Sequence, residues 1–144
     1  MVALVIDTNV LVSAMLKRGG TARRVIRACL VGDYEPLIGA ALFSEYEDVF
    51  SREPLWQASL LTANEREEVF NGFLEKCRWV EVFYAWRPNL PDEADYHLVE
   101  LGLAGNAVAI VTRNTGDLTR GELRFPSLSI LTPEACLETH PCLP

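Results

Sequence analysis

The apolar run Val2–Ile6, which stops at Asp7, constrains the fold of this chain more than any other stretch. An apolar run of this length that is rich in β-branched residues is typical of a strand buried on both faces of a parallel sheet. Asp7 then lies at the carboxyl end of that strand, where ligands and catalytic groups gather in open α/β sheets. The position predicts either a chemical role for Asp7 or capping of the helix that follows.

Strands and helices alternate along the rest of the sequence. Several stretches repeat apolar residues at helical spacing, and short apolar runs and turn residues separate them. The further strands are expected at residues 34–39, 78–83, 107–111 and 127–131. Such alternation implies right-handed crossovers and a mainly parallel sheet with helices on both faces, which is an α/β fold. We expect one domain over residues 1–144, with a loose tail from about residue 139.

The composition is that of one globular domain. Of the 144 residues, 49% are hydrophobic, which is enough for a sizeable core. No apolar run approaches the roughly 20 residues that span a bilayer, and the first run has no basic leader, so we expect a cytoplasmic protein without a membrane segment. The four cysteines show no C-x-x-C spacing and are expected to be reduced residues of the core or the tail.

Charge gives a weaker indication of what the protein binds. The formal net charge of −7 argues against a basic surface that coats nucleic acid. A local basic strip nevertheless follows the first helix. It consists of Lys17, Arg18, Arg23, Arg24 and Arg27. These side chains are candidates for contacts with phosphates, although an ordinary solvated helix face has the same pattern.

Two acids on helices are placed where an acid is unusual. Glu45 comes three residues after Leu42 and shares its inward helical face, and Asp95 comes three residues before Leu98 in the same relation. An ionised carboxylate that turns toward the domain is costly unless it is paired or bound to a metal. Both residues are therefore candidates for a site.

A second apolar strand, residues 107–111, also ends in polar residues, the loop 112–117. This loop and Asp7 would lie at the carboxyl ends of two strands. Acids that converge without a buried base repel one another, so a divalent cation is their natural partner, and hard oxygen ligands favour Mg²⁺ or Mn²⁺ over zinc. Neither histidine fits a general base, because His97 is expected to be exposed on a helix and His140 to belong to the tail.

Four segments resemble, in order, the four acidic motifs of PIN-domain nucleases. They are residues 6–14, 41–45, 95–104 and 110–117. The similarity is especially close to the branch that holds predicted toxins of bacterial and archaeal toxin–antitoxin modules. It implies a three-layer α/β/α sandwich with a central, mainly parallel sheet of about five strands. It also implies Mg²⁺ or Mn²⁺ as cofactor, cleavage of single-stranded RNA, a homodimer and an antitoxin partner.

The resemblance also assigns roles to individual residues. Asp7, Glu45 and Asp95 take the three core acidic positions and are the predicted catalytic residues, with Asp7 and Asp95 as metal ligands. Thr112 takes the usual hydroxyl position after the fourth strand. The predicted substrate-binding residues are Asn9, Thr112, Arg23, Arg24 and Arg27.

The fourth motif departs from the pattern of many relatives. They carry an acid two residues after the threonine, where this chain has Asn114. Asn114 still offers a carbonyl oxygen to a hard cation but no charge. Gly116 gives the loop freedom to bring in Asp117 instead. Both Asn114 and Asp117 are candidates for the remaining metal ligand.

Two other functions remain open at this point. A regulatory or binding domain could keep the PIN fold without useful catalysis, and the altered fourth motif favours that alternative. A Mg²⁺-dependent phosphatase on a similar sheet would also use a strand that ends in Asp. Such enzymes with an aspartyl nucleophile usually have a second acid two residues later, where this chain has Asn9.

Overall fold

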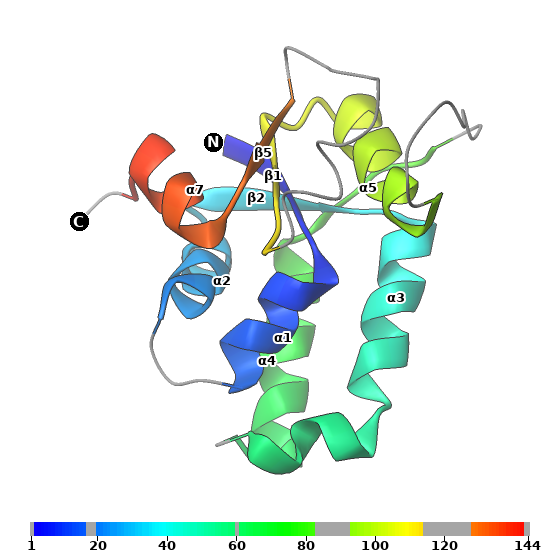
Figure 1. Cartoon of the computed structure of the whole chain (residues 1–144), viewed down its shortest axis with the longest axis vertical. Helices are drawn as coiled ribbons and strands as arrows, with labels where there is room; N and C mark the ends of the chain where they lie inside the picture. Colours follow the sequence, from blue (N-terminus) through cyan, green and yellow to red (C-terminus); the bar gives the residue numbers. More distant parts are fainter. Residues whose placement is uncertain (1, 17–19, 60, 83–92, 114–127, 143–144) are drawn as a thin grey trace.

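The computed structural model describes residues 2–16, 20–59, 61–82, 93–113 and 128–142, apart from the side chains of residues 53, 58 and 93–96. Within these residues five parallel strands form one sheet in the order β3-β2-β1-β4-β5 (Figure 1). The strands are β1 (Val2–Ile6), β2 (Tyr34–Ile38), β3 (Arg78–Trp79), β4 (Ala109–Val111) and β5 (Ser129–Leu131). The predicted parallel α/β sheet is confirmed.

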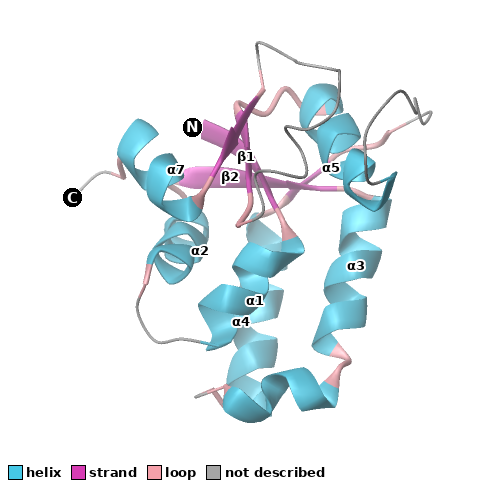
Figure 2. Ribbon diagram, viewed as in Figure 1, coloured by secondary structure: helices cyan, strands magenta, loops and turns pink. Residues whose placement is uncertain are grey.

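Helices cover both faces of this sheet (Figure 2). They are α1 (Thr8–Leu16), α2 (Thr21–Val31), α3 (Ala40–Phe50), the 3₁₀ helix η1 (Glu53–Ala58), α4 (Ala63–Lys76), α5 (Glu93–Ala104) and α7 (Pro133–Thr139). Helix α5 covers one face. On the other side α2 packs against α1, α4 and α7, and α3 lies beside α1. The result is the expected three-layer arrangement.

The central strand β1 forms the middle of the core. Leu4, Val5 and Ile6 have no exposed surface. Val5 pairs with Leu37 of β2 on one side and with Ile110 of β4 on the other. Burial of each such side chain contributes about 1.5–3 kcal/mol, so the strand that ends at Asp7 is held firmly.

Gly105, which directly follows α5, lies close to the side chain of Leu37 in β2. A Cβ on Gly105 would lie 2.5 Å from Leu37 Cδ1 and 3.0 Å from Val80 Cγ2. Since real Cβ atoms do not come within 3.0 Å of such an atom, a larger residue at this position would force the buried Leu37 side chain to shift. The end of α5 is therefore fixed relative to β2.

Two expectations about local structure are wrong. The strand expected at residues 78–83 is limited to Arg78–Trp79 at the sheet edge, and among the described strands it pairs with β2. Residues 139–142 are not a loose tail, because the Tyr34 hydroxyl donates to the His140 carbonyl oxygen at 2.5 Å and Cys142 packs against the core. The packing of α7 on α2 holds this segment in place.

The described cysteines are free thiols, as expected, with Cys29 and Cys136 buried and Cys77 and Cys142 half-buried. Among the described helices, none combines the length and the apolar character that crossing a membrane requires.

Candidate active site

Asp7 connects β1 to α1. Its backbone N–H donates to the Val111 carbonyl oxygen at 2.9 Å, and its own carbonyl oxygen accepts the Val10 N–H at 3.0 Å in the first turn of α1. Its carboxyl group lies at the carboxyl edge of the sheet and the residue is only 8% exposed. The backbone of Asp7 therefore begins α1, while its carboxyl group faces the polar residues at the edge of the sheet, and its role in a site stays a prediction.

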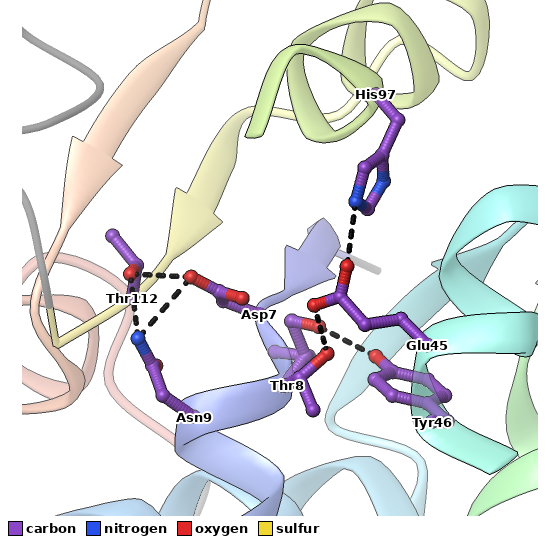
Figure 3. A network of polar contacts seen from close by, with 8 residues as sticks. Asp7, Thr8, Asn9, Glu45, Tyr46, His97 and Thr112 are labelled. Atoms are coloured by element: carbon purple, nitrogen blue, oxygen red, sulfur yellow. Dashed lines mark hydrogen bonds and ion pairs between the residues drawn. The ribbon is translucent and has the colours of Figure 1, made fainter. Parts of the chain in front are cut away.

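Thr112 meets Asp7 because their strands are neighbours. Strands β1 and β4 pair in register up to Ile6 and Val111, so the residues that follow come together. The buried Thr112 hydroxyl donates to Asp7 Oδ2 at 2.7 Å (Figure 3). The geometry brings together two of the residues that the sequence assigns to the site.

Asn9 completes this corner of the site. Its amide nitrogen lies 3.3 Å from both Asp7 Oδ2 and Thr112 Oγ1, and its amide oxygen accepts the Arg113 backbone N–H at 3.1 Å. Asn9 and Thr112 thus hold the Asp7 carboxylate and the start of the following loop. Their predicted contact with substrate stays a prediction.

Glu45 reaches the site from α3. Its Oε1 accepts the Thr8 hydroxyl at 2.6 Å, and its Oε2 lies 2.9 Å from His97 Nε2 (Figure 3). The neighbouring Tyr46 is fully buried and donates from its hydroxyl to the Ile6 carbonyl oxygen at 2.5 Å. This contact fixes α3 to the end of β1, directly before Asp7. The predicted inward orientation of Glu45 is confirmed.

The expectation that His97 is exposed on its helix is wrong. Its side chain is 18% exposed and forms an ion pair with Glu45 when the imidazole is protonated. His97 comes four residues before the buried Leu101, so it lies on the face of α5 that turns inward. The spacing of four residues between His97 and Leu101 could have predicted this inward orientation from the sequence. Among the described residues, no hydrogen-bond partner reaches the buried Nδ1 atom.

The two carboxyl groups have opposite electrostatic environments. Burial raises the pKa of Asp7 above its ordinary value, the hydrogen bond from Thr112 lowers it, and the negative charge of Glu45 raises it further. The hydrogen bond with His97 holds the pKa of Glu45 below its ordinary value, against the effect of burial. Asp7 is therefore a carboxylate that its surroundings destabilise, whereas Glu45 is a carboxylate that its neighbours stabilise.

The other predicted metal ligands, apart from Asp7, are described only in part. Asp95 lies in the first turn of α5, two residues before His97, and its side chain is outside the described residues. Asn114 and Asp117 also lie outside them. Within the described part of the chain, no group of three or more His, Cys, Asp or Glu side chains is close enough to share a metal ion.

The donors that are described fit a hard divalent cation. Asp7 and Glu45 supply carboxylate oxygens, and their mutual repulsion is the kind that a cation relieves. Because these donors are hard oxygen ligands, they fit Mg²⁺ or Mn²⁺ better than a soft metal. Asp95 would add a third carboxylate from the helix that carries His97.

Two members of the basic strip, Arg24 and Arg27, do not lie beside Asp7. Arg24 and Arg27 line a hollow of about 330 Å³ together with Asp33 and Cys142. Asp33 directly precedes β2, so this hollow lies at the amino-terminal edge of the sheet, opposite the edge of Asp7. Arg23 lies on the same helix, and Lys17 and Arg18 are outside the described residues.

A different arginine lies beside the site. Arg113 directly follows Thr112, is exposed, and donates from its side-chain Nε to the Ser13 hydroxyl at 3.1 Å. The prediction of substrate contacts omitted it. Its place in the sequence, next to a predicted site residue, was a usable signal.

Residues 3–116 match the family model of the PIN domain. Since the match covers most of the chain, the protein belongs to the PIN-domain family, and the predicted membership is confirmed. Such membership also removes the main support for the phosphatase alternative.

The fold is similar to that of a solved structure, described as the crystal structure of VapBC2 from Rickettsia felis bound to a DNA fragment from their promoter. The match has 15% sequence identity and a TM-score of 0.59, and it covers 90% of this chain and 98% of the other. At that identity it shows the shared fold. No curated protein matches the chain significantly.

Proposed function

We propose that this protein is a Mg²⁺- or Mn²⁺-dependent endoribonuclease that cleaves single-stranded RNA. The observation that carries the proposal is the convergence of Asp7 and Glu45, from two different elements, at the carboxyl edge of the sheet in a PIN-domain protein. Two carboxylates that converge at such an edge, with the pKa of Asp7 raised by burial, are typical of a metal-assisted hydrolase.

The residues of the chain would divide the chemistry between them. Asp7 and Asp95 would hold the cation, and Thr112 and Asn9 would keep the Asp7 carboxylate in one orientation. When bound, the cation would supply positive charge that stabilises the phosphorane and acidifies a water molecule. Glu45, which its neighbours keep ionised, would add negative charge to the cation site and orient the attacking water. We expect products with a 5′-phosphate and a 3′-hydroxyl.

We also propose that the protein is the toxin of a toxin–antitoxin pair and that it forms a homodimer. The sequence resemblance to that branch supports this role, as does the similar fold of VapBC2, which was crystallised bound to promoter DNA. A small adjacent gene that encodes a DNA-binding protein, and its co-purification with this chain, would support the role. Sedimentation of the isolated chain as a monomer would refute the homodimer.

A cleavage assay tests the enzymatic proposal. Unstructured and structured RNAs are incubated with the protein in Mg²⁺, in Mn²⁺ and in EDTA, and Asp7→Asn is the matched variant. We expect cleavage of the unstructured RNA that EDTA and the substitution both abolish. Cleavage that continues in EDTA, or in Asp7→Asn, would contradict the proposal.

One observation supports a second candidate function, that of a regulatory PIN domain without catalytic activity. Asn114 replaces an acid of the fourth motif, which removes one charge from the expected metal site. A dead site should bind Mn²⁺ only weakly. Calorimetric titration with Mn²⁺ therefore separates this candidate from the enzyme before any RNA is identified.

A further inference from the structure

Both carboxylate oxygens of Glu45 are held by side chains from other helices. Thr8 of α1 donates to Oε1 at 2.6 Å, and His97 of α5 lies 2.9 Å from Oε2. We propose that His97 is a positioning residue, which fixes Glu45 in the orientation that the metal and water site requires. This inference deepens the proposed function and rests on it.

Glu45 needs such support because it is a long side chain at a half-open position. Its side chain is 37% exposed, and a glutamate loses much rotamer freedom when it is fixed. With Thr8 alone, only one oxygen would be held and the carboxylate plane could rotate about that contact. The second contact, from a different helix, defines the plane. Hydrogen bonds to ionised carboxylates are also stronger than neutral ones.

The direction of this hydrogen bond follows from the chemistry of the pair. An ionised carboxylate can only accept, so Nε2 carries the hydrogen and His97 is the donor. The other ring nitrogen, Nδ1, is buried and has no partner within the described residues. Within the described residues, the imidazole therefore makes its polar contact with Glu45.

The two contacts also leave lone-pair positions of the Glu45 carboxylate free to bind the metal or a water molecule. A carboxylate has about four lone-pair positions, and Thr8 and His97 occupy two of them. The other two point in directions that the held plane determines. In metal sites, partners that orient a ligand in this way typically affect metal affinity or activity by about 10- to 100-fold.

A purely structural role for His97, as a link between α3 and α5, makes a different prediction. Tyr46 already ties α3 to β1 through the Ile6 carbonyl oxygen, so the fold does not depend on this link alone. If His97 were only a link, its loss would lower the melting temperature and leave Mn²⁺ binding unchanged.

The test compares His97→Leu, which removes the donor, with His97→Gln, which keeps a side-chain N–H donor. The measurements are the dissociation constant for Mn²⁺ by calorimetry, the Mn²⁺ concentration for half-maximal RNA cleavage, and the melting temperature. We expect His97→Leu to weaken Mn²⁺ binding about tenfold and His97→Gln to restore it to within about threefold of the parent. Unchanged Mn²⁺ binding in His97→Leu would overturn the proposal.

A double-mutant cycle then asks whether His97 acts through Glu45. Adding His97→Leu to Glu45→Gln should weaken Mn²⁺ binding no further than Glu45→Gln alone, because the acid that His97 positions is already lost. Losses that multiply would overturn the proposal. If the parent binds Mn²⁺ but cleaves no RNA, the proposed function fails, and the Mn²⁺ series still decides the role of His97.

Discussion

The two sides of the site are built in different ways. On one side, Asp7 is buried, directly follows the central strand, and is fixed through its backbone to Val111 and through its carboxylate to Thr112. On the other, Glu45 is a half-exposed side chain in the middle of a helix, and side chains from two other helices hold it. The fold therefore determines the position of Asp7, whereas a few side-chain contacts determine that of Glu45.

This difference predicts which side of the site tolerates substitutions. At Asp7 the surroundings raise the pKa of the carboxyl group, so ionisation of Asp7, which the metal site requires, lowers the stability of the folded protein. At Glu45 the neighbours lower the pKa, and the charge costs the fold little. Substitutions on the Asp7 side should abolish function, and those on the Glu45 side should change it by degrees.

The largest effect is expected for Asp7→Asn. Loss of a ligand charge should lower RNA cleavage by about a hundredfold or more. In metal-free buffer the variant should melt at a higher temperature than the parent, because the buried charge is gone and the amide oxygen can still accept from Thr112. The pKa of Asp7 is raised, so its charge costs the parent stability as pH rises above the ordinary value of 3.8. The stability gain should therefore be larger at pH 7 than at pH 3.

Melting curves at both pH values, in EDTA, measure this gain. A variant that melts below the parent at pH 7 while cleaving RNA normally would show that Asp7 is a structural cap alone.

The loop after Thr112 should give the next largest effect, on the metal requirement. If Asp117 completes the site, Asp117→Asn should raise the Mg²⁺ requirement about tenfold, a cost of roughly 1.4 kcal/mol. Asn114→Asp should then partly restore it in the double variant. The measurement is cleavage rate against Mg²⁺ concentration. An unchanged curve for Asp117→Asn would make Asn114 the better candidate.

A matched pair of threonine substitutions compares the two sides directly. Thr112→Val removes the donor to the buried Asp7, and Thr8→Val removes the donor to the half-exposed Glu45. We expect losses in the free energy of unfolding of about 2 and about 1 kcal/mol, because a lost hydrogen bond costs more where water cannot replace it. Urea denaturation measures both. Equal losses, or a larger loss for Thr8→Val, would contradict the contrast between the two sides.

The smallest effect is expected at the arginines. Arg113→Ala, beside the site, should weaken RNA binding severalfold and reduce the salt dependence by about one unit of slope. Replacement of Arg24 and Arg27 should have a smaller effect, since they lie at the opposite edge of the sheet. The sequence-based prediction named Arg23, Arg24 and Arg27 as substrate contacts and did not include Arg113, so a salt series of binding constants for both variants tests that prediction against the structure.

The same contrast explains how much could be predicted from sequence. The buried run Val2–Ile6 and the acid that follows are local signals, and pairing of parallel strands places Thr112 beside Asp7 with no knowledge of side chains. Helical periodicity was also enough to place Glu45 inward. The partnership of Glu45 with His97 depends on how α3 and α5 pack, across 52 residues of sequence, and periodicity carries no such information.

The positions of Arg24 and Arg27 could not be predicted from sequence for a related reason. Arginines that follow Asp7 in sequence were expected to lie near it in space. Helix α2 instead runs back along the sheet to its amino-terminal edge, because a right-handed crossover must return the chain to the start of the next parallel strand. Proximity along the chain is therefore a poor guide to the site beyond the first helix.

The central claim is that Asp7 and Glu45, held so differently, serve one cation. Calorimetric titration with Mn²⁺ of the parent, of each single variant Asp7→Asn and Glu45→Gln, and of the double variant tests it most directly. We predict one site per chain in the parent, weaker binding in each single variant, and no measurable binding in the double variant. Binding by the double variant with the affinity of the parent would contradict the account.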